Sequence, residues 1–155
     1  MAEENRKLAI ICSKGSLDMA YPGLVLANSA LSYGIDVVMF FTFWGLDMVT
    51  KSKMNELKIS PVGNTSMGMP NALAVIPGVT GMATSMMKGK IAKLDIPPIG
   101  EFMDMIVDAG AKLYGCKMSV DMMDLTKDKL SDGVIDIVSA GDFMDMSEGA
   151  QIIFI

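Results

Sequence analysis

The cysteines Cys12 and Cys116 are the side chains of this sequence best suited to nucleophilic chemistry. Cys116 lies within LYGCKMSVDMMD (residues 113–124), between an apolar run and the expected first turn of a helix. Backbone N–H groups and the positive end of the dipole at a helix start stabilise a thiolate and lower its pKa, and Lys117 would add to this effect. A buried cysteine that only fills space is the alternative, and position alone leaves both interpretations open.

Cys12 stands near the carboxyl end of another apolar run, KLAIIC (residues 7–12). Because strand residues beside isoleucine are normally core, we expect Cys12 to be packed, with at most a supporting role in the same pocket. Two cysteines are too few for a secreted disulfide framework and suit a reducing compartment. The sequence opens with acidic residues and lacks the basic leader and long apolar region of an export signal, so we expect a cytoplasmic location.

The sequence contains no histidine. This excludes Ser-His-Asp and Cys-His nucleophile pairs, histidine-based zinc sites and imidazole acid–base steps. The 17 methionines could offer thioethers to copper(I), but the methionine pairs have no cysteine or histidine beside them and follow apolar helical patterns. We therefore expect the methionines to fill the core, and we expect no metal and no cofactor.

The turn SKGSLD (residues 13–18) follows the first apolar run and offers Lys14, Gly15 and Ser16 at the start of an expected helix. The backbone N–H groups of such a turn can hold an anion. The turn lacks the G-x-G-x-x-G pattern of dinucleotide sites, and the glycine spacing of residues 63–68 lacks the Lys-Ser/Thr of a phosphate-binding loop. The turn therefore indicates an anion site without a nucleotide motif.

Apolar runs and helical patterns alternate along the chain. The expected strands are residues 7–12, 35–43, 112–116, 134–140 and 151–155, and the expected helices run from Ser16 or Asp18 to Gly34, from Ile99 to Ala109, from about Ser119, and over residues 141–149. Uncharged β-branched and aromatic runs are typical of strands buried on both faces of a parallel sheet. The alternation predicts an α/β fold, a three-layer α/β/α sandwich with a five-stranded, mainly parallel sheet.

A long apolar insert at about residues 52–97 separates the second expected strand from the third. No charged side chain occurs between Ile59 and Lys88, so a membrane span has to be considered. Repeated proline, glycine and asparagine residues break the helix that a bilayer demands, so we expect no membrane span. We expect a long loop and then a helix from about Thr80 to Leu94, apolar enough to pack on a neighbouring subunit or to cover a site.

The size and composition of the chain limit its organisation and its partners. With 155 residues it is expected to form a single domain, residues 1–155, that includes the insert. The formal charge of -5 and the pI near 4.6 argue against a nucleic-acid partner, because such affinity comes mainly from clustered lysine and arginine. A hydrophobic fraction of 51% and a mean hydropathy of +0.41 indicate more apolar surface than one small domain hides, so we expect a homo-oligomer.

Three stretches of the sequence, FFTFWGLDMV (residues 40–49), PGVTGMATSMMKGKI (77–91) and GCKMSVDMMD (115–124), resemble the DsrE/DsrF-like family. They resemble in particular its longer archaeal and bacterial branch, often called predicted peroxiredoxins, and the likeness runs in the same order over nearly the whole chain. The resemblance implies a five-stranded parallel sheet, cytoplasmic homo-oligomers and a role in sulfur relay.

In relatives of this kind, a cysteine at the position of Cys116 accepts sulfane sulfur or a thiosulfonate group. The resemblance implies a sulfur carrier or sulfurtransferase that holds the group on Cys116, as a persulfide or thiosulfonate, and passes it to a small carrier protein, with a rhodanese-type donor upstream. Whether it turns over as an enzyme or serves as a stoichiometric carrier stays open. Backbone N–H groups of Lys117, Met118 and Ser119 would stabilise the anionic adduct, and apolar cover from Trp44 and residues 64–90 would exclude water.

Cys12 falls on no motif of the family. The family sheet order places the first strand between the second and the fifth, which puts the first and third strands roughly 9 to 10 Å apart. A disulfide needs Cα atoms within about 7 Å, so the resemblance implies that Cys12 and Cys116 of one subunit do not pair. The alternative from another functional class is a non-catalytic ligand-binding or regulatory module that uses the turn from Lys14 to Ser16, with Cys116 structural.

Overall fold

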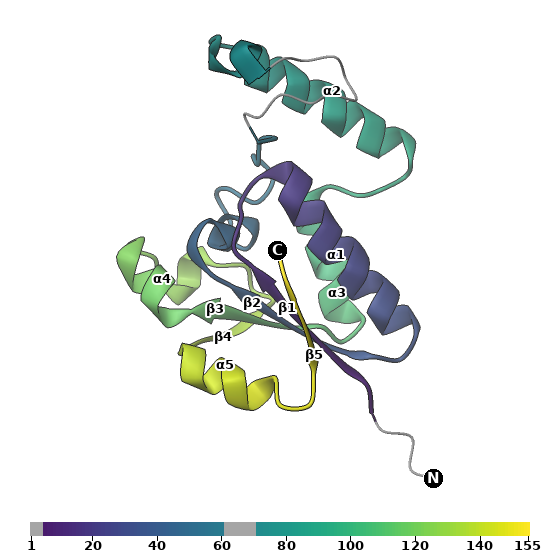
Figure 1. Ribbon diagram of the computed structural model, residues 1–155, viewed down its shortest axis with the longest axis vertical. Helices are drawn as coiled ribbons and strands as arrows, with labels where there is room; N and C mark the ends of the chain where they lie inside the picture. Colours follow the sequence, from purple (N-terminus) through teal and green to yellow (C-terminus); the bar gives the residue numbers. More distant parts are fainter. Residues whose placement is uncertain (1–4, 61–70) are drawn as a thin grey trace.

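The computed structural model describes residues 5–60 and 71–155 (Figure 1). The glycine spacing of residues 63–68 lies outside the described residues. The strands are β1 (Lys7–Cys12), β2 (Asp36–Phe41), β3 (Lys112–Cys116), β4 (Val134–Val138) and β5 (Gln151–Phe154). They form one sheet in the order β4-β3-β2-β1-β5, in which all neighbours are parallel. This confirms the predicted five-stranded parallel sheet.

Helices cover both faces of this sheet. The α-helices are α1 (Leu17–Ser32), α2 (Val79–Lys93), α3 (Ile99–Asp108), α4 (Lys117–Met122) and α5 (Ala140–Met146), and the short 3₁₀ helices are η1 (Phe43–Met48), η3 (Asn71–Val75) and η4 (Lys127–Lys129). Helices α1 and α3 lie on one side of the sheet, and the shorter α4 and α5 lie on the other (Figure 1). The arrangement is the predicted three-layer sandwich.

Two hydrophobic clusters fill the spaces on either side of the sheet. Successive strand side chains point to opposite faces, so each strand contributes to both clusters. In β1, Ile10 and Cys12 join the large cluster beneath α1 and α3. Ala9 joins a smaller cluster with Cys116 and Phe143, in which Phe143 of α5 stacks on a phenylalanine of β2. Cys12 and Cys116 therefore face opposite sides of the sheet.

The second strand ends earlier than its apolar pattern predicts. The uncharged run continues to Phe43, but β2 stops at Phe41 and the backbone turns into η1. Phe43 has a φ of 47°, in the left-handed region that side chains rarely adopt, and its N–H leaves the sheet to bond with the hydroxyl of Ser119 at 2.9 Å. A contact distant in the sequence thus decides where the strand ends.

The insert contains the expected helix, α2, but this helix does not cover Cys116 within one chain. Its inward residues Met87 and Ile91 pack against the large cluster, and Thr84 accepts a hydrogen bond from the N–H of Ile59 at 3.1 Å. No residue of 71–97 belongs to the cluster around Cys116. The expectation of cover from the insert is therefore wrong for its described part, because α2 packs toward the opposite face. None of the helices in the described part of the chain is long and apolar enough to span a bilayer.

Candidate functional site

Cys116 occupies the junction between β3 and α4. It is the last residue of β3 and the N-cap residue of α4, and it pairs in register with Val138, the last residue of β4. Its side chain is 5% exposed, so the sulfur lies just beneath the surface at the carboxyl edge of the sheet. Ligands of open α/β folds bind at this edge, so Cys116 has the position that a reactive group requires.

Hydroxyl and N–H groups surround the sulfur of Cys116. The hydroxyls of Thr42 and Ser119 lie 2.9 Å apart, and the Ser119 oxygen also accepts the N–H of Phe43 at 2.9 Å. Either hydroxyl can donate in the bond between them, and both hydroxyls also lie within hydrogen-bonding reach of the Cys116 sulfur. The sulfur also accepts hydrogen bonds from the backbone N–H groups of Ser119 and Met118. The carboxyl ends of β2 and β3 together build this donor set.

Burial of the Cys116 thiol favours its neutral form and by itself raises the pKa. The backbone N–H and hydroxyl of Ser119, the hydroxyl of Thr42 and the backbone N–H of Met118 lower the pKa by more, so it lies below its ordinary value. Hydrogen bonds to a thiolate act in this direction because the charged sulfur is the stronger acceptor. Among the described residues, the groups that stabilise the anionic sulfur are hydroxyl and backbone groups, and no positively charged side chain is one of them.

The predicted residues after Cys116 contribute unequally. Ser119 and the backbone of Met118 reach the sulfur, as described above. Lys117 instead forms an exposed ion pair with Asp121 at 3.2 Å, so its ammonium group binds a carboxylate of the same helix. An exposed pair of this kind contributes little, and the donors are therefore hydroxyl and backbone groups.

The sequence predictions did not include Thr42, which the structure brings to Cys116. Thr42 follows the last residue of β2 directly, and Cys116 ends the neighbouring strand β3. The carboxyl ends of adjacent parallel strands meet at one edge, so a hydroxyl one residue past a strand was the signal available in the sequence.

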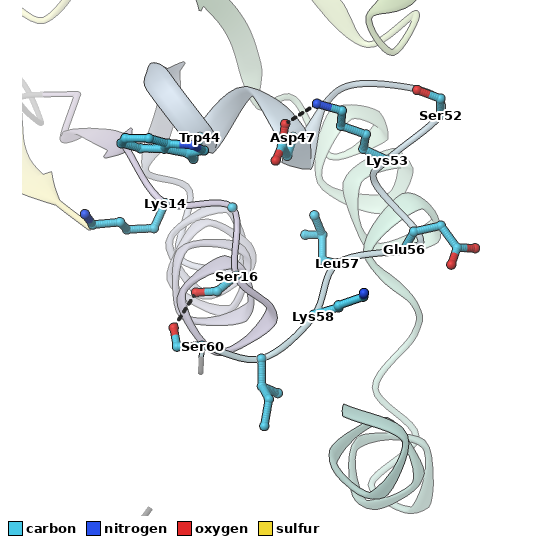
Figure 2. Close-up of a pocket in the computed structure, with 12 residues that line it drawn as sticks. Lys14, Ser16, Trp44, Asp47, Ser52, Lys53, Glu56, Leu57, Lys58 and Ser60 are labelled. Carbon is cyan, nitrogen blue, oxygen red and sulfur yellow. Dashed lines mark hydrogen bonds and ion pairs between the residues drawn. The ribbon is translucent and has the colours of Figure 1, made fainter. Parts of the chain in front are cut away.

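The other predicted ligand residues line a separate cavity of about 520 Å³, shown in Figure 2. Lys14, Gly15, Ser16 and Trp44 contribute to its wall, together with residues of the segment 47–60. The cavity wall does not include Cys116 or residues 117–119. The structure therefore divides the predicted site residues into a thiol site and a lysine-lined cavity, with η1 contributing to both.

The start of α1 in this cavity is already hydrogen bonded. The N–H of Leu17 donates to the carbonyl of Lys58 at 2.8 Å, and the hydroxyl of Ser60 bonds that of Ser16 at 3.0 Å (Figure 2). Asp18 accepts the N–H of Ser60 at 2.7 Å and places a carboxylate in the first turn. A carboxylate here opposes an anion, so an anion in the cavity would have to rely on the lysine side chains.

Two glycines allow the loop after β1 to lie against η1. A Cβ atom on Gly15 would stand 2.4 Å from the carbonyl oxygen of Trp44, and one on Gly45 would stand 1.9 Å from the carbonyl oxygen of Cys12. Only glycine fits such close backbone contacts. The close contacts of Gly15 and Gly45 thus fix the position of η1, and Thr42 is the N-cap residue of this helix.

Cys12 has a different environment from Cys116. Its side chain is buried at the end of β1 against α1, where desolvation raises its pKa from 9.0 to about 12. In the part of the chain that the structure describes, no donor offsets this burial, in contrast to Cys116. Cys12 is therefore a neutral packed thiol. In the described part of the chain, no cluster of three acidic or cysteine side chains could hold a metal ion.

A family model described as DsrE/DsrF/DrsH-like matches residues 4–155. The chain belongs to this family. A family member from Allochromatium vinosum, named sulfur carrier protein DsrE2, is 41% identical over 139 residues, which cover 84% of this chain and 86% of the relative. The uncharacterized protein YrkE of Bacillus subtilis is 26% identical, and the match covers both chains completely.

Solved structures share the fold at low sequence identity. Protein MTH1491 from Methanobacterium thermoautotrophicum has a TM-score of 0.60 at 9% identity, and the ychN protein from E. coli has a TM-score of 0.61 at 12% identity. Each match covers 97% of this chain and 99% of the other. At these identities the likeness concerns the fold alone, and it agrees with the α/β architecture described above.

Proposed function

We propose that this protein is a sulfur carrier or sulfurtransferase that holds sulfane sulfur or a thiosulfonate group on Cys116. The observation that carries the proposal is the thiol of Cys116 with its hydroxyl and N–H donors, which lower its pKa at the carboxyl edge of the sheet. The 41% identity to a protein named as a sulfur carrier supports the same function.

The chemistry needs one thiolate and no histidine. The Cys116 thiolate attacks the outer sulfur of a donor persulfide R–S–SH, the bond between the two donor sulfurs breaks, and R–S⁻ leaves. With tetrathionate, the thiolate attacks one of the two central sulfurs, thiosulfate leaves, and Cys116 carries an –S–SO₃⁻ group. Both products place an anionic or readily ionised sulfur beside the donors of Ser119 and Thr42, which stabilise it.

Discharge of the carrier follows the same exchange in reverse. The thiolate of a small carrier protein attacks the outer sulfur, and Cys116 departs as a thiolate whose lowered pKa makes it a good leaving group. We propose a rhodanese-type donor upstream by the same logic, because such a donor presents a persulfide. A reducing cytoplasm would keep Cys116 free between rounds.

Single-turnover transfer tests the proposal. The protein is loaded with polysulfide, separated from free reagent, and mixed with a small acceptor protein that carries one accessible thiol. Intact masses of both proteins should show a sulfur lost from this chain and gained by the acceptor. The same protocol with Cys116→Ser should give no transfer, and transfer that survives this substitution would refute the proposal.

The lysine-lined cavity favours a second function, binding of an anionic ligand by a regulatory module. Lys14 and Lys58 line a cavity of about 520 Å³ beside the exposed Trp44, in a wall that also holds Glu56 and the ion pair of Lys53 with Asp47. Equilibrium binding of small anions distinguishes the two functions. A ligand-binding module should keep its affinity for anions when both cysteines are replaced, and should lose that affinity in Lys14→Ala. A sulfur carrier should lose its sulfur uptake when both cysteines are replaced, and Lys14→Ala should leave that uptake unchanged.

A further inference from the structure

A second cavity, of about 610 Å³, lies between helices α1, α2 and α3, at the end of the molecule where α1 begins (Figure 1). Its wall holds residues of α1, of the turn at 54–55, of α2 and of the segment 96–101 that leads into α3. Among the described residues, it shares no wall residue with the lysine-lined cavity, and Cys116 is not part of its wall. We call it the α2 cavity. Its volume falls within the roughly 300–1,000 Å³ of small-molecule sites.

Apolar side chains make up most of the wall of the α2 cavity, among them Leu17, Met54, Ile91, Ile96 and Ile99. Leu17, Met54 and Ile99 belong to the large cluster beneath α1 and α3, and the two other isoleucines pack against it. The cavity thus opens onto the edge of the hydrophobic core. Water inside such a wall finds few hydrogen-bond partners, so an apolar group that replaces the water gains free energy.

Hydrogen bonds between separate elements fix the shape of the α2 cavity. The hydroxyl of Tyr21 on α1 donates to the carbonyl of Pro97 at 2.9 Å. The N–H of Gly100 donates to the side-chain oxygen of Asn55 at 3.0 Å. Both bonds join the start of α3 to another part of the wall. Because the protein's own bonds hold the walls, a ligand does not have to order them, which lowers the free-energy cost of binding.

Within the described part of the chain, the charged side chains that line the α2 cavity are those of Lys88 and Glu101, and both are exposed. The ammonium group of Lys88 donates to the carbonyl of Asn55 at 3.2 Å, and no carboxylate of residues 5–60 and 71–155 pairs with it. Glu101 lies in the first turn of α3, where the positive end of the helix dipole offsets its charge. Helix α2 carries three lysines and no acidic residue. Lys88 therefore offers an acidic group a positive charge that no described carboxylate occupies.

We propose that the α2 cavity binds a small amphipathic acid, a molecule with an apolar chain or ring and one carboxylate. The apolar part contacts Leu17, Ile91 and Ile99, and the carboxylate lies beside Lys88 and away from Glu101. The bound molecule contacts α1, α2 and α3 together, so it stabilises the packing of α2 on the rest of the domain. This binding does not depend on the sulfur chemistry of Cys116.

Isothermal titration calorimetry with decanoate, kept below its micelle concentration, tests the site. Decanoate should bind at one molecule per chain and more tightly than decylamine, which has the same chain and the opposite charge. Lys88→Gln should weaken decanoate binding by about fivefold, the upper range for an exposed charge pair. Lys90→Gln removes the same charge from α2 outside the cavity wall and should leave the affinity unchanged. Glu101→Gln should tighten decanoate binding, because it removes a charge that repels the carboxylate.

Ala92→Trp tests the position of the ligand, because Ala92 lines the α2 cavity and a larger side chain there fills the space. This variant should bind no decanoate, whereas Lys14→Ala, in the lysine-lined cavity, should bind decanoate as the wild type does. If Ala92→Trp does not fold, the comparison of Lys88→Gln with Lys90→Gln decides.

Four results would overturn the proposed site: no saturable binding of decanoate, equal affinity for decanoate and decylamine, wild-type affinity in Lys88→Gln, or binding that survives in folded Ala92→Trp. Sulfur uptake by Cys116 should persist in all of these variants, so failure of this site and failure of the carrier function give different results.

Discussion

The side chains of Cys12 and Cys116 lie on opposite faces of one sheet, with β2 between their strands. Phe41 of β2 pairs with Cys12 on one side and with Gly115 on the other, so the two cysteines stand almost level along the strands. Their side chains nevertheless belong to different clusters, one under α1 and α3 and the other under α4 and α5.

Mild oxidation should therefore produce no disulfide between Cys12 and Cys116 of one chain. Two strand spacings, roughly 9 to 10 Å, exceed the Cα separation that a disulfide spans, and the side chains point apart. Peptide mapping under non-reducing conditions, with the unfolded protein oxidised in parallel as the positive control, checks this expectation. A Cys12–Cys116 peptide from the folded monomer would contradict the sheet order and the single-thiol mechanism.

The buried Cys12 thiol should make the protein less stable as pH rises. The unfolded chain releases this proton near its ordinary pKa of 9.0, whereas the folded chain retains it until about 12. The unfolded state is thus favoured by proton loss between these values, and the free energy of unfolding falls by up to about 1.4 kcal/mol per pH unit.

Urea unfolding of the wild type and of Cys12→Ala across this window measures the effect. The variant lacks the thiol, so its free energy of unfolding should fall less steeply with pH, while tyrosine and lysine titrations are common to both proteins. Equal slopes would mean that Cys12 ionises in the folded state and is not packed as described.

The hydroxyl of Ser119 should set the reactivity of Cys116. The thiolate is the form that attacks iodoacetamide and displaces iodide, so the alkylation rate rises with pH through the pKa of Cys116. Ser119→Ala removes a donor to the sulfur, which moves the midpoint of this profile to higher pH. A hydrogen bond to a charged group contributes about 1.5–3 kcal/mol, so the rate at neutral pH should fall at least severalfold.

Ser85→Ala is the matched control for Ser119→Ala. Its hydroxyl bonds the carbonyl of Gly81 on the exposed side of α2, so the alkylation profile of Cys116 should not move. Thr42→Val should shift the profile in the same direction as Ser119→Ala. If neither substitution changed the alkylation rate of Cys116, the hydroxyls would not stabilise its thiolate, which would contradict the proposed function.

Gly45 should be intolerant of any side chain. Gly45→Ala places a methyl group 1.9 Å from the carbonyl oxygen of Cys12, and backbone has to move to relieve the overlap. We expect a loss of stability of at least about 1–3 kcal/mol in urea unfolding. Gly81→Ala in α2 is the control, because no described residue outside the adjoining helix backbone lies within 4 Å of its new methyl group, and it should stabilise by about 0.5–1 kcal/mol.

The hydrophobic patterns predicted all five strands, because buried parallel strands read as uncharged runs, and the residues that start and end helices indicated the helices between them. Helix α4 begins at Lys117, two residues before the predicted start near Ser119. The helix η1 was missed, because its first residues continue the apolar pattern of β2. The turn at Phe43 depends on its hydrogen bond to Ser119, 76 residues away, which no local pattern contains.

The thiol site was partly predictable for the same reason. Cys116 follows from its place at a strand end, whereas the contribution of Thr42 depends on which strands are neighbours. The separation of the Lys14 turn from Cys116 likewise depends on the face to which each side chain points. Sequence patterns locate strand ends, and tertiary packing decides which of them share a site.

The most direct test of the central claim is the intact mass of the protein after incubation with tetrathionate and, separately, with polysulfide. The wild type and Cys12→Ser should gain a thiosulfonate group or sulfur atoms, and Cys116→Ser should gain none, because Cys116 alone has donors that stabilise its thiolate. An adduct that persists in Cys116→Ser, or no adduct on any of the three proteins, would contradict the assignment of Cys116 as the sulfur-carrying thiol.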